Sequence, residues 1–286
     1  MGINLLVDAG GTSVKWFVRN LTLGTESQFR IDGMSPLYLT EDDLVSKIRA
    51  AFPQDAFCQE VQKVEYYGTG CAADQAPWRM KAALQRVFPK AQIMVDSDMM
   101  GAARVLWNSE PGIVGIIGTG SNAGFYDGYT ISYARPSLGY LLGDEGSGAW
   151  LGRHLLRDWL YGILPPELSE AMYVDYGIAL GLERDGNVFK STEPVMNRLF
   201  RGERPNQFLA SFARFLWYHI KHPYSQKLVL QAMEAYVTTL ALPNIVRAHK
   251  GLKMVGSVAD AFQEQLCEVC EQHGLRLLEV RKDALP

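Results

Sequence analysis

Two glycine-rich segments each follow a short apolar run, and their residue types suit the binding of phosphate groups. The first is Asp8–Thr12 (DAGGT) and the second is Gly118–Asn122 (GTGSN). Glycine lets backbone N–H donors come close to phosphate oxygens, whose charge a metal ion helps to neutralise. Either segment alone is typical of a tight turn. Because both occur at the same place in two halves of the sequence, we interpret them as phosphate-binding tips.

Two charged residues accompany the first tip. Asp8 stands beside the glycines, where a carboxylate can hold Mg²⁺ through water, since this ion gives up its waters reluctantly. Lys15 carries a charge that would offset phosphate, with a solvated strand lysine as the alternative interpretation. Two common nucleotide motifs are excluded by spacing. There is no GxxxxGK[ST] of a P-loop, and Gly118–Gly124 reads GTGSNAG instead of the dinucleotide-binding GxGxxG.

An acid pair, Asp96 and Asp98, follows a buried apolar run at the start of a predicted helix. Asp96 suits a helix cap, because its carboxylate would accept backbone N–H groups and complement the helix dipole. Asp98 lies at the C-terminal end of a core strand, where open sheets place their ligands. Phosphoryl transfer to a hydroxyl uses a carboxylate to accept the proton. We therefore predict that Asp98, and not Asp96, is a general base.

The segment Gly143–Gly148 (GDEGSG) places two acids and three glycines directly before a predicted helix. Such a run is costly in conformational entropy unless the backbone must come close to a ligand. The carboxylates of Asp144 and Glu145 are suited to accept hydrogen bonds from the hydroxyls of a sugar. We predict that this segment binds substrate.

Apolar periodicity and turn residues predict the elements that position these groups. The first half reads as strands at 3–7, 14–18 and 26–31, a helix at 40–51 capped by Thr40, a strand at 64–67, a helix at 77–87, a strand at 92–95 and a helix from 96. The second half reads as strands at 112–117, 123–126 and 129–133, a helix after 148, a mostly helical insert at about 151–249, a strand at 253–258, a helix at 259–272 and a strand at 275–280. The shared order predicts a duplicated α/β protein with a nucleotide-binding cleft between its halves. The polar break at 108–112 predicts domains 1–110 and 111–286.

Composition and charge narrow the class of protein. The 286 residues are 48% apolar and 21% charged, which suits a folded chain with a sizeable core. A net charge of −3 without a basic run argues against nucleic acid as a partner. No apolar stretch approaches the roughly 18 residues of a membrane span, and the apolar start is too short for a signal peptide. We expect a cytoplasmic protein with no membrane partner.

The four cysteines are too few and too scattered for a disulfide scaffold. Cys267 and Cys270 form a lone CxxC late in a predicted helix, without the second ligand pair that a zinc site needs. We interpret both as buried helix cysteines.

Together these segments resemble the N-acetylglucosamine kinase branch of the BadF/BadG-type ATPase family, within the superfamily of actin, sugar kinases and heat-shock chaperones. The matches follow the family order over nearly the whole chain and are Asp8–Thr12, Asp98–Gly101, Gly118–Asn122, Gly143–Ser147 and Gly256–Val258. The combination that includes GDEGS is strongly specific. The resemblance implies two ribonuclease H-like (actin-like ATPase) domains related by duplication, with the helical insert in the second.

The resemblance also implies ATP-dependent phosphorylation of an amino sugar, with N-acetylglucosamine as the expected substrate and Mg²⁺ as the metal. It assigns to ATP the residues Gly10, Gly11, Thr12, Gly118, Thr119, Gly120, Ser121, Gly256, Ser257 and Ala259. It implies Asp98 as the base, and Asp144 with Thr69 and Gly70 on the sugar. The sequence does not define the oligomeric state, and a homodimer is compatible with it.

The sequence departs from the family pattern at two places that bear on which sugar is bound. Family members often carry a sugar-binding asparagine after the third strand, whereas this sequence reads Gly33–Leu37 (GMSPL), so Ser35 is the candidate there. An aromatic residue before GDEGS is replaced by Leu138. The resemblance also implies a last helix beyond Pro286, which would make this chain incomplete at its end.

Two other functions stay open. An ATPase activator of a 2-hydroxyacyl-CoA dehydratase would hold an iron–sulfur cluster with cysteines, and Cys71 has no partner at such spacing. A non-catalytic sugar sensor would usually append a helix-turn-helix, whereas this sequence begins at the first strand. A turnover assay separates a sensor from an enzyme.

Overall fold

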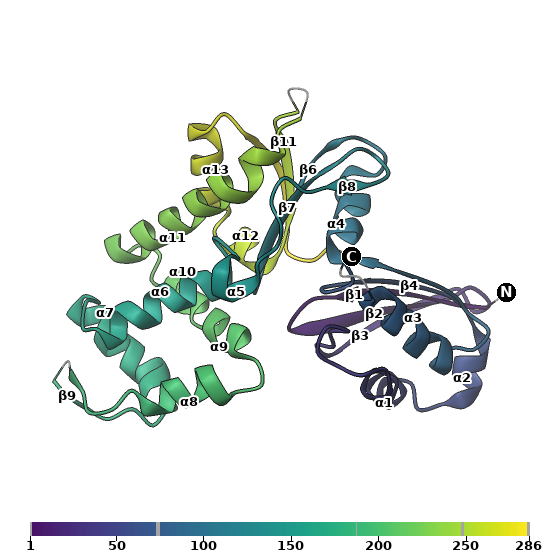
Figure 1. The fold of residues 1–286 in the computed structure, drawn as a ribbon, viewed down its shortest axis with the longest axis horizontal. Helices are drawn as coiled ribbons and strands as arrows, with labels where there is room; N and C mark the ends of the chain where they lie inside the picture. Colours follow the sequence, from purple (N-terminus) through teal and green to yellow (C-terminus); the bar gives the residue numbers. More distant parts are fainter. Residues whose placement is uncertain (1, 73–74, 187, 247–248, 285–286) are drawn as a thin grey trace. The chain divides into compact units, whose positions relative to one another are not determined.

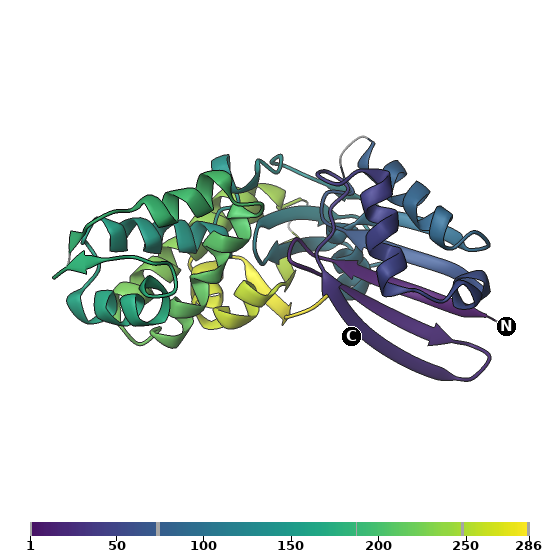
Figure 2. The ribbon, with the colours of Figure 1, turned by 90° about the horizontal axis from the view of Figure 1, so that it is seen from below.

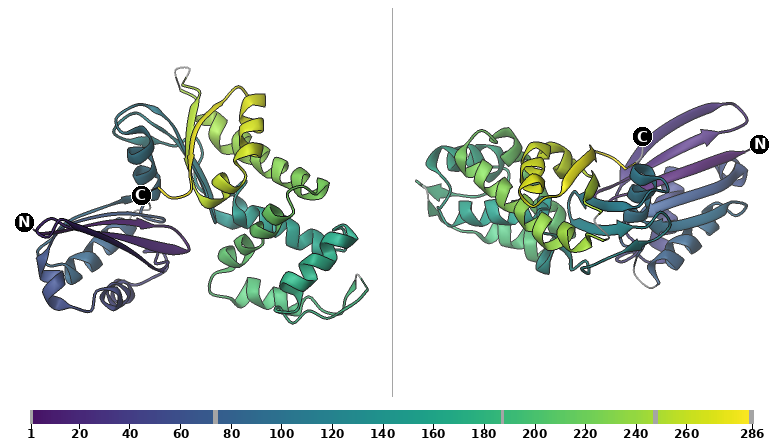
Figure 3. Two further views of the ribbon diagram at one scale, coloured as in Figure 1. Left: turned by 180° about the vertical axis from the view of Figure 1, so that it is seen from behind. Right: turned by 90° about the horizontal axis from the view of Figure 1, so that it is seen from above.

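The computed structural model describes residues 2–72, 75–186, 188–246 and 249–284, and it divides into two compact units (Figures 1, 2 and 3). The first unit comprises residues 2–108 together with Ala284, and the second spans residues 109–283. Each unit has a five-stranded sheet and a hydrophobic core of its own. In the described ranges, no helix has the length and apolar character needed to cross a membrane.

The first unit begins with three strands, and helices and strands follow. In chain order its elements are β1 (Ile3–Ala9), β2 (Ser13–Asn20), β3 (Thr25–Asp32), α1 (Glu41–Ala51), α2 (Asp55–Glu60), β4 (Val61–Gly68), α3 (Ala76–Val87), β5 (Gln92–Ser97) and α4 (Asp98–Trp107). The sheet order is β3-β2-β1-β4-β5. Strands β1, β2 and β3 pair antiparallel as a meander, whereas β4 and β5 run parallel to β1. The C-terminal ends of β1, β4 and β5 therefore lie along one edge of the sheet.

Alternating burial along β1 explains how the helices pack on this sheet. Ile3, Leu5 and Val7 are buried with the apolar faces of α1 and α3, and α4 covers the opposite face of the sheet (Figure 1). Trp16 is fully buried on the α1 side, with its ring centroid 4.9 Å from that of Phe52. Helices therefore cover both faces of this sheet.

The second unit repeats this arrangement around a different sheet. Its elements before the insert are β6 (Gly112–Ile117), β7 (Ser121–Tyr126), β8 (Ile131–Ser132) and α5 (Gly139–Leu142). Its elements after the insert are β11 (Gly251–Val255), α12 (Ser257–Ala261), α13 (Gln263–Gln272) and β12 (Arg276–Arg281). The sheet order β12-β11-β6-β7-β8 matches that of the first unit, with β6 in the place of β1 and β11 in the place of β4. The predicted duplicated α/β fold is confirmed.

The segment between β8 and β11 is mostly helical, as predicted. It contains α6 (Gly148–Leu160), α7 (Pro166–Met172), η1 (Tyr173–Gly177), α8 (Glu193–Arg201), α9 (Pro205–Ser211), α10 (Ala213–Tyr218), α11 (Pro223–Tyr236), η2 (Val237–Ala241) and η3 (Leu242–Asn244), with a short hairpin of β9 (Arg184–Asp185) and β10 (Val188–Phe189). Helix α6 begins at Gly148, three residues before the predicted start of the insert. Apolar side chains of α6, α9 and α11 share one core with the sheet of this unit.

Several predicted elements differ from the structure. The strand predicted at 129–133 shrinks to Ile131–Ser132, because the Asp127 carboxylate accepts the backbone N–H groups of Tyr129 and Thr130 and forms a turn there. The strand predicted at 253–258 ends at Val255, since Gly256 takes a φ of +126°. The helix predicted at 259–272 is instead two helices that break at Phe262, whose ψ of 32° is not helical.

Candidate functional site

Asp98, the predicted base, is the first residue of α4 and lies at the C-terminal edge of the first sheet. Its Oδ2 accepts a hydrogen bond of 2.7 Å from the Thr69 hydroxyl, and its Oδ1 accepts one of 2.9 Å from the backbone N–H of Met99. Desolvation by the surrounding protein raises the pKa of Asp98 above its ordinary value of 3.8, although both hydrogen bonds act in the opposite direction. A carboxylate with a raised pKa is a stronger base when it is ionised.

The cap of α4 is Ser97 and not Asp96. The Ser97 side chain accepts the backbone N–H of Met100 at 3.1 Å. Asp96 lies inside β5, and its Oδ1 accepts the backbone N–H of Ser97 at 2.8 Å. The prediction that Asp96 caps the helix is wrong, because the chain stays extended through Ser97 and the helix begins at Asp98, two residues after the predicted start at 96.

The predicted sugar-binding residues of the first unit lie close together. The backbone N–H of Thr69 donates to the carbonyl of Ala9, the last residue of β1, at 2.9 Å and so continues the β1–β4 pairing one residue beyond β4. Gly70 has a φ of +84°, and a Cβ added there would lie 2.9 Å from the Ser35 Oγ. Both the backbone and the close approach of Ser35 therefore require glycine at position 70. The fold brings Ser35 to Gly70, and Thr69 to Asp98.

The sequence predicts that Asp8 begins the glycine-rich turn. In the structure Asp8 instead lies inside β1. It stands opposite Lys15 on β2 and Tyr67 on β4, and Tyr67 stands opposite Asp96 on β5. Residues in one such row point to the same face of a sheet. This face is the one that α4 covers, since a Cβ added at Gly101 would come within 2.8 Å of the Tyr67 side chain. Asp8, Lys15 and Asp96 thus share one face at the C-terminal edge.

The glycines of the first tip leave room for a ligand. A Cβ at Gly11 would meet nothing within 4 Å, and one at Gly10 would make only an ordinary contact of 3.6 Å. Neither glycine has a positive φ. Neither packing nor backbone conformation therefore explains the glycine at position 11, whereas the close approach of a phosphate would. Thr12 closes this tip, and its carbonyl accepts the backbone N–H of Gly33 at 3.0 Å.

The second tip is built together with the GDEGSG segment. The backbone N–H groups of Gly148 and Ala149 donate to the carbonyls of Gly118 and Thr119 at 2.8 and 3.1 Å. The Ser121 hydroxyl donates to the carbonyl of Glu145 at 2.7 Å. A Cβ at Gly118 would meet nothing within 4 Å, and Gly118 has no positive φ, as at Gly11. Each tip therefore contains a glycine with open space on its side-chain side.

Asp144 belongs to this second tip. The backbone N–H of Ser121 donates to its Oδ1 at 3.3 Å, and a Cβ added at Gly120 would lie 2.9 Å from its Oδ2. Asp144 has a φ of +56°, which is uncommon for a residue other than glycine. Burial raises the pKa of Asp144, and the hydrogen bond from Ser121 lowers it. Asp144 thus lies among residues assigned to ATP, whereas Thr69 and Gly70 belong to the first unit.

The residues assigned to the adenosine divide into two groups. A Cβ at Gly256 would lie 2.2 Å from the carbonyl oxygen of Ile117, the residue just before the second tip. Only glycine lets the two backbone segments come this close. Ser257 is exposed next to Gly256. The side chain of Ala259, however, is fully buried in the core of the second unit. Gly256 and Ser257 are accessible to a ligand in a way that the Ala259 side chain is not.

Comparison with solved structures identifies the family. Scans against models of known families and against curated protein sequences find no match. A structure of a proposed N-acetylglucosamine kinase from Porphyromonas gingivalis, however, aligns with 100% of this chain and 96% of its own, at 31% identity and a TM-score of 0.83. The chain belongs to this family of actin-like sugar kinases. It is therefore an ATP-dependent carbohydrate kinase, and the resemblance to the N-acetylglucosamine kinase branch is confirmed.

Two more distant structures share the fold of this kinase. A proposed N-acetylglucosamine kinase from Chromobacterium violaceum aligns with 99% of this chain and 96% of its own, at 20% identity and a TM-score of 0.70. A ROK family glucokinase from Streptomyces griseus, solved with glucose and AMPPNP, aligns with 99% of this chain and 95% of its own, at 15% identity and a TM-score of 0.51.

The environment of Cys71 bears on the alternative of a dehydratase activator. Burial, and then the negative charges of Asp98 and Asp96, raise the pKa of the Cys71 thiol to about 12. The thiolate is the form that binds a metal, so this environment disfavours an iron ligand at Cys71. No group of three or more His, Cys, Asp and Glu residues in the described ranges is arranged to hold a metal ion.

The CxxC pair of this kinase is only half buried. Cys270 is fully buried on the inner face of α13, as expected. Cys267 is partly exposed, and its thiol lies 3.6 Å from a carboxylate oxygen of Glu271. The interpretation of both as buried is wrong for Cys267, because it lies at the edge of the buried face of α13, which Leu266, Val269 and Cys270 form.

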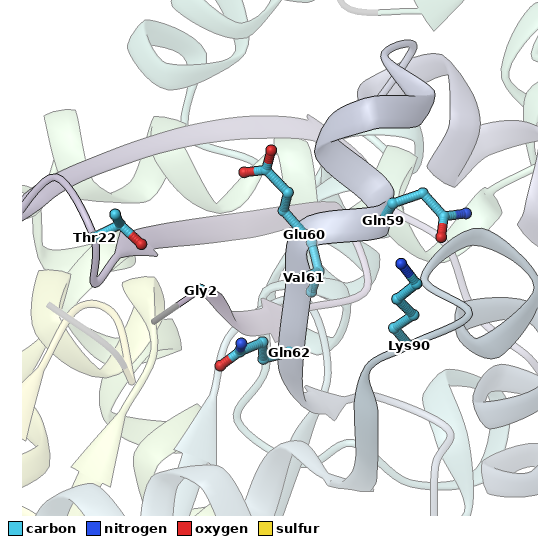
Figure 4. Close-up of a pocket in the computed structure, with 7 residues that line it drawn as sticks. All are labelled: Gly2, Thr22, Gln59, Glu60, Val61, Gln62 and Lys90. Carbon is cyan, nitrogen blue, oxygen red and sulfur yellow. The ribbon is translucent and has the colours of Figure 1, made fainter.

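The hollow drawn in Figure 4 lies away from these residues. Its lining includes Gly2 and Val61, at the N-terminal ends of β1 and β4, together with Lys90. Asp8, Thr69 and Asp98 stand at or just beyond the C-terminal ends of their strands. The hollow therefore lies at the opposite end of the first sheet, and we do not assign it to the kinase site.

Two residues that connect the site were not singled out by the sequence analysis. A Cβ at Gly33 would come within 2.6 Å of the Gly11 carbonyl oxygen. The absence of a side chain at Gly33 therefore lets the start of the Ser35 segment pack directly on the first tip. Arg79, on α3, donates to the carbonyls of Pro36 and Leu39 in that segment. A single glycine and a single arginine carry no motif, and only their contacts reveal them.

Proposed function

We propose that this kinase phosphorylates an amino sugar, N-acetylglucosamine, by direct phosphoryl transfer from ATP to a sugar hydroxyl, with Asp98 as the general base. The observation that carries the proposal is the Asp98 carboxylate, whose pKa burial raises and which the Thr69 hydroxyl orients at 2.7 Å beside the Ser35 segment. The identity of 31% over 96% of the P. gingivalis chain supports an amino sugar as the substrate.

Asp98 accepts the proton of the attacking hydroxyl. Each of its oxygens already takes one hydrogen bond, from Met99 or from Thr69, and a carboxylate oxygen has a second lone pair free to take the proton. The Thr69 hydroxyl donates to Asp98, so its own oxygen can accept a hydrogen bond from the sugar. We propose that Ser35, Gly70 and Thr69 orient the sugar so that its hydroxyl meets Asp98.

The two tips hold the nucleotide in this proposal. Gly10, Gly11, Thr12 and Lys15 contact phosphate in the first unit, and Gly118, Thr119, Gly120 and Ser121 do so in the second. The open space over Gly11 and Gly118 supports these contacts. Asp8 holds Mg²⁺ through water, and Gly256 and Ser257 lie near the adenosine. When bound, Mg²⁺–ATP supplies the phosphoryl group and much of the charge neutralisation.

Asp144 and Glu145 bind the sugar from the second unit. The backbone of Ser121 fixes the Asp144 carboxylate, so an acceptor of sugar hydroxyls is held at a phosphate-binding tip. Glu145 is fixed through its carbonyl by the Ser121 hydroxyl, which leaves its side chain available. The same serine thus orients both acids.

A coupled assay of ADP release across a panel of sugars tests the proposal. The panel contains N-acetylglucosamine, its C2 epimer N-acetylmannosamine, glucosamine and glucose, each with Mg²⁺ and with excess EDTA. We expect the highest kcat/KM with N-acetylglucosamine and no turnover with EDTA. A higher kcat/KM for glucose than for every amino sugar would refute the assignment of the substrate. If calorimetry detected sugar binding but the assay detected no ADP release, the protein would be a non-catalytic sugar sensor instead of an enzyme.

A further inference from the structure

Arg79 occupies an unfavourable place on its helix. It lies in the first turn of α3, where the positive end of the helix dipole repels a cation. The same turn contains no acidic residue, and the helix has no side-chain cap. The stability of α3 itself therefore gives no reason for a positive charge at this position, and the reason must lie in what the guanidinium contacts.

The guanidinium of Arg79 is bound to the backbone of the segment that follows β3. Its Nη1 donates to the carbonyl oxygen of Pro36 and, at 3.5 Å, to that of Leu39. These carbonyls belong to a turn in which the backbone N–H groups of Tyr38 and Leu39 donate to the Ser35 carbonyl at 3.2 and 3.1 Å. Arg79 therefore ties this turn to α3.

The turn contacts the residues around the proposed base. A Cβ added at Gly70 would lie 2.9 Å from both the Leu37 Cγ and the Ser35 Oγ, so the turn packs directly on Gly70. Gly70 follows Thr69, whose hydroxyl donates to Asp98 at 2.7 Å. A short path of contacts thus leads from the guanidinium through the turn to the residues proposed to hold the sugar.

We propose that Arg79 is a positioning residue for the sugar, which keeps the Ser35–Leu39 turn in the conformation that binds substrate. This inference rests on the proposed function, because it takes Ser35, Gly70 and Thr69 as sugar contacts. Arg79 acts on the substrate only through the turn. Its loss should therefore weaken sugar binding more than it slows the chemical step, because Asp98 is held by Met99 and Thr69 and not by the turn.

Arg86 provides a matched control on the same helix. It lies seven residues after Arg79, and its Nη1 contacts Glu41 at 2.8 Å and Asp42 at 2.7 Å, at the start of α1. Like Arg79, it ties α3 to the chain that follows β3, but it is exposed and does not contact the turn. If Arg79 served only to fasten α3 to its surroundings, removal of either arginine would have the same consequence.

The experiment compares Arg79→Ala, Arg79→Lys and Arg86→Ala in the full chain by steady-state kinetics with the best sugar of the panel. We expect Arg79→Ala to raise the KM for the sugar about tenfold or more, the scale of a lost charge-assisted hydrogen bond. The KM for ATP should not change, and kcat should fall much less than the sugar KM rises. Arg79→Lys should give an intermediate sugar KM, since an ammonium lacks the fork that spans two carbonyls. Arg86→Ala should match the wild type.

Three results would overturn the role of Arg79: an unchanged sugar KM in Arg79→Ala, an equal rise in the KM for ATP, or the same rise in Arg86→Ala. If Arg79→Ala fails to fold, Arg79→Lys decides, and a wild-type sugar KM in that variant overturns the role. Wild-type turnover on the sugar panel separates the two proposals. No sugar-dependent turnover would refute the proposed function, whereas normal wild-type turnover with an unaffected Arg79→Ala would refute only this inference.

Discussion

The carboxylate of Asp98 experiences opposing effects that together suit a base. Burial favours its neutral form, while the hydrogen bonds from Thr69 and Met99, and its place in the first turn of α4, favour its charged form. Burial is the larger effect, so the pKa is raised. The group is therefore more basic than an exposed aspartate.

Asp98→Asn should lower kcat by roughly 10²–10⁴, because asparagine keeps the shape but cannot accept a proton. The KM for the sugar should change much less, as expected for an interaction made chiefly in the transition state. Asp96→Asn is the matched control. The Asp96 oxygen only accepts the backbone N–H of Ser97, which an amide oxygen can also do. Steady-state kinetics of both variants test this, and an inactive Asp96→Asn beside an active Asp98→Asn would reverse the assignment.

The pH dependence of kcat/KM reports the free enzyme and should show the raised pKa of Asp98 directly. The base works only when ionised, so activity should fall as the pH falls through this pKa, which lies above the ordinary 3.8. Thr69→Val removes a hydrogen bond that lowers the pKa, so the acid limb should move to higher pH. A shift to lower pH, or an acid limb that Thr69→Val leaves in place, would show that Asp98 does not control it.

At the scale of elements, the start of α4 determines where the base lies. Ser97 caps the helix by accepting the N–H of Met100, and the helix then begins at Asp98. Ser97→Ala should reduce the free energy of unfolding by about 1 kcal/mol, whereas Ser97→Gly should cost only a few tenths for the loss of the same bond. Urea denaturation followed by circular dichroism measures both values. If Ser97→Ala were neutral while Asp96→Ala cost about 1 kcal/mol, Asp96 would be the cap after all.

The segment that follows β3 contacts three other parts of the first unit. Gly33 packs it on the first tip, Ser35 and Leu37 pack on Gly70, and Arg79 binds it from α3. It therefore contacts both the proposed phosphate residues and the proposed sugar residues of the first unit.

At the scale of the whole molecule, the duplication gives each unit the same sheet order and the same kind of glycine tip. Gly11→Ala and Gly118→Ala should each leave thermal stability unchanged or slightly raised, because the added Cβ meets nothing within 4 Å and neither φ is positive. Each should raise the KM for ATP about tenfold if a phosphate approaches the backbone there. Thermal melting and steady-state kinetics separate the two effects.

Gly120→Ala serves as the contrasting variant in that experiment. Its Cβ would lie 2.9 Å from the Asp144 Oδ2, so it should lower thermal stability as well as ATP binding. Wild-type KM values for ATP in both Gly11→Ala and Gly118→Ala would argue that these tips are turns and do not bind phosphate.

Much of the fold and of the site is encoded in short stretches of sequence. The sequence predicts Thr40 as a helix cap, and the structure confirms it: Thr40 forms a capping box with Asp43, three residues later. The strands around Asp8–Thr12 and Gly118–Asn122 are short apolar runs ended by glycine, and these too are visible locally. The position of Asp98 after a buried strand was likewise predicted from neighbouring residues. Such features depend on interactions between residues close in the chain, which is why the sequence alone predicts them.

Other features were decided only by the tertiary structure, because they depend on residues far apart in the chain. Asp144 lies against Gly120 and Ser121, which no local pattern indicates, and Arg79 meets the Ser35 turn from 40 or more positions away. The choice of Ser97 over Asp96 as cap depends on how far β5 stays paired with β4 before the helix begins. Local sequence thus indicated which groups are candidates for the chemistry, and packing between distant segments determined which of them meet.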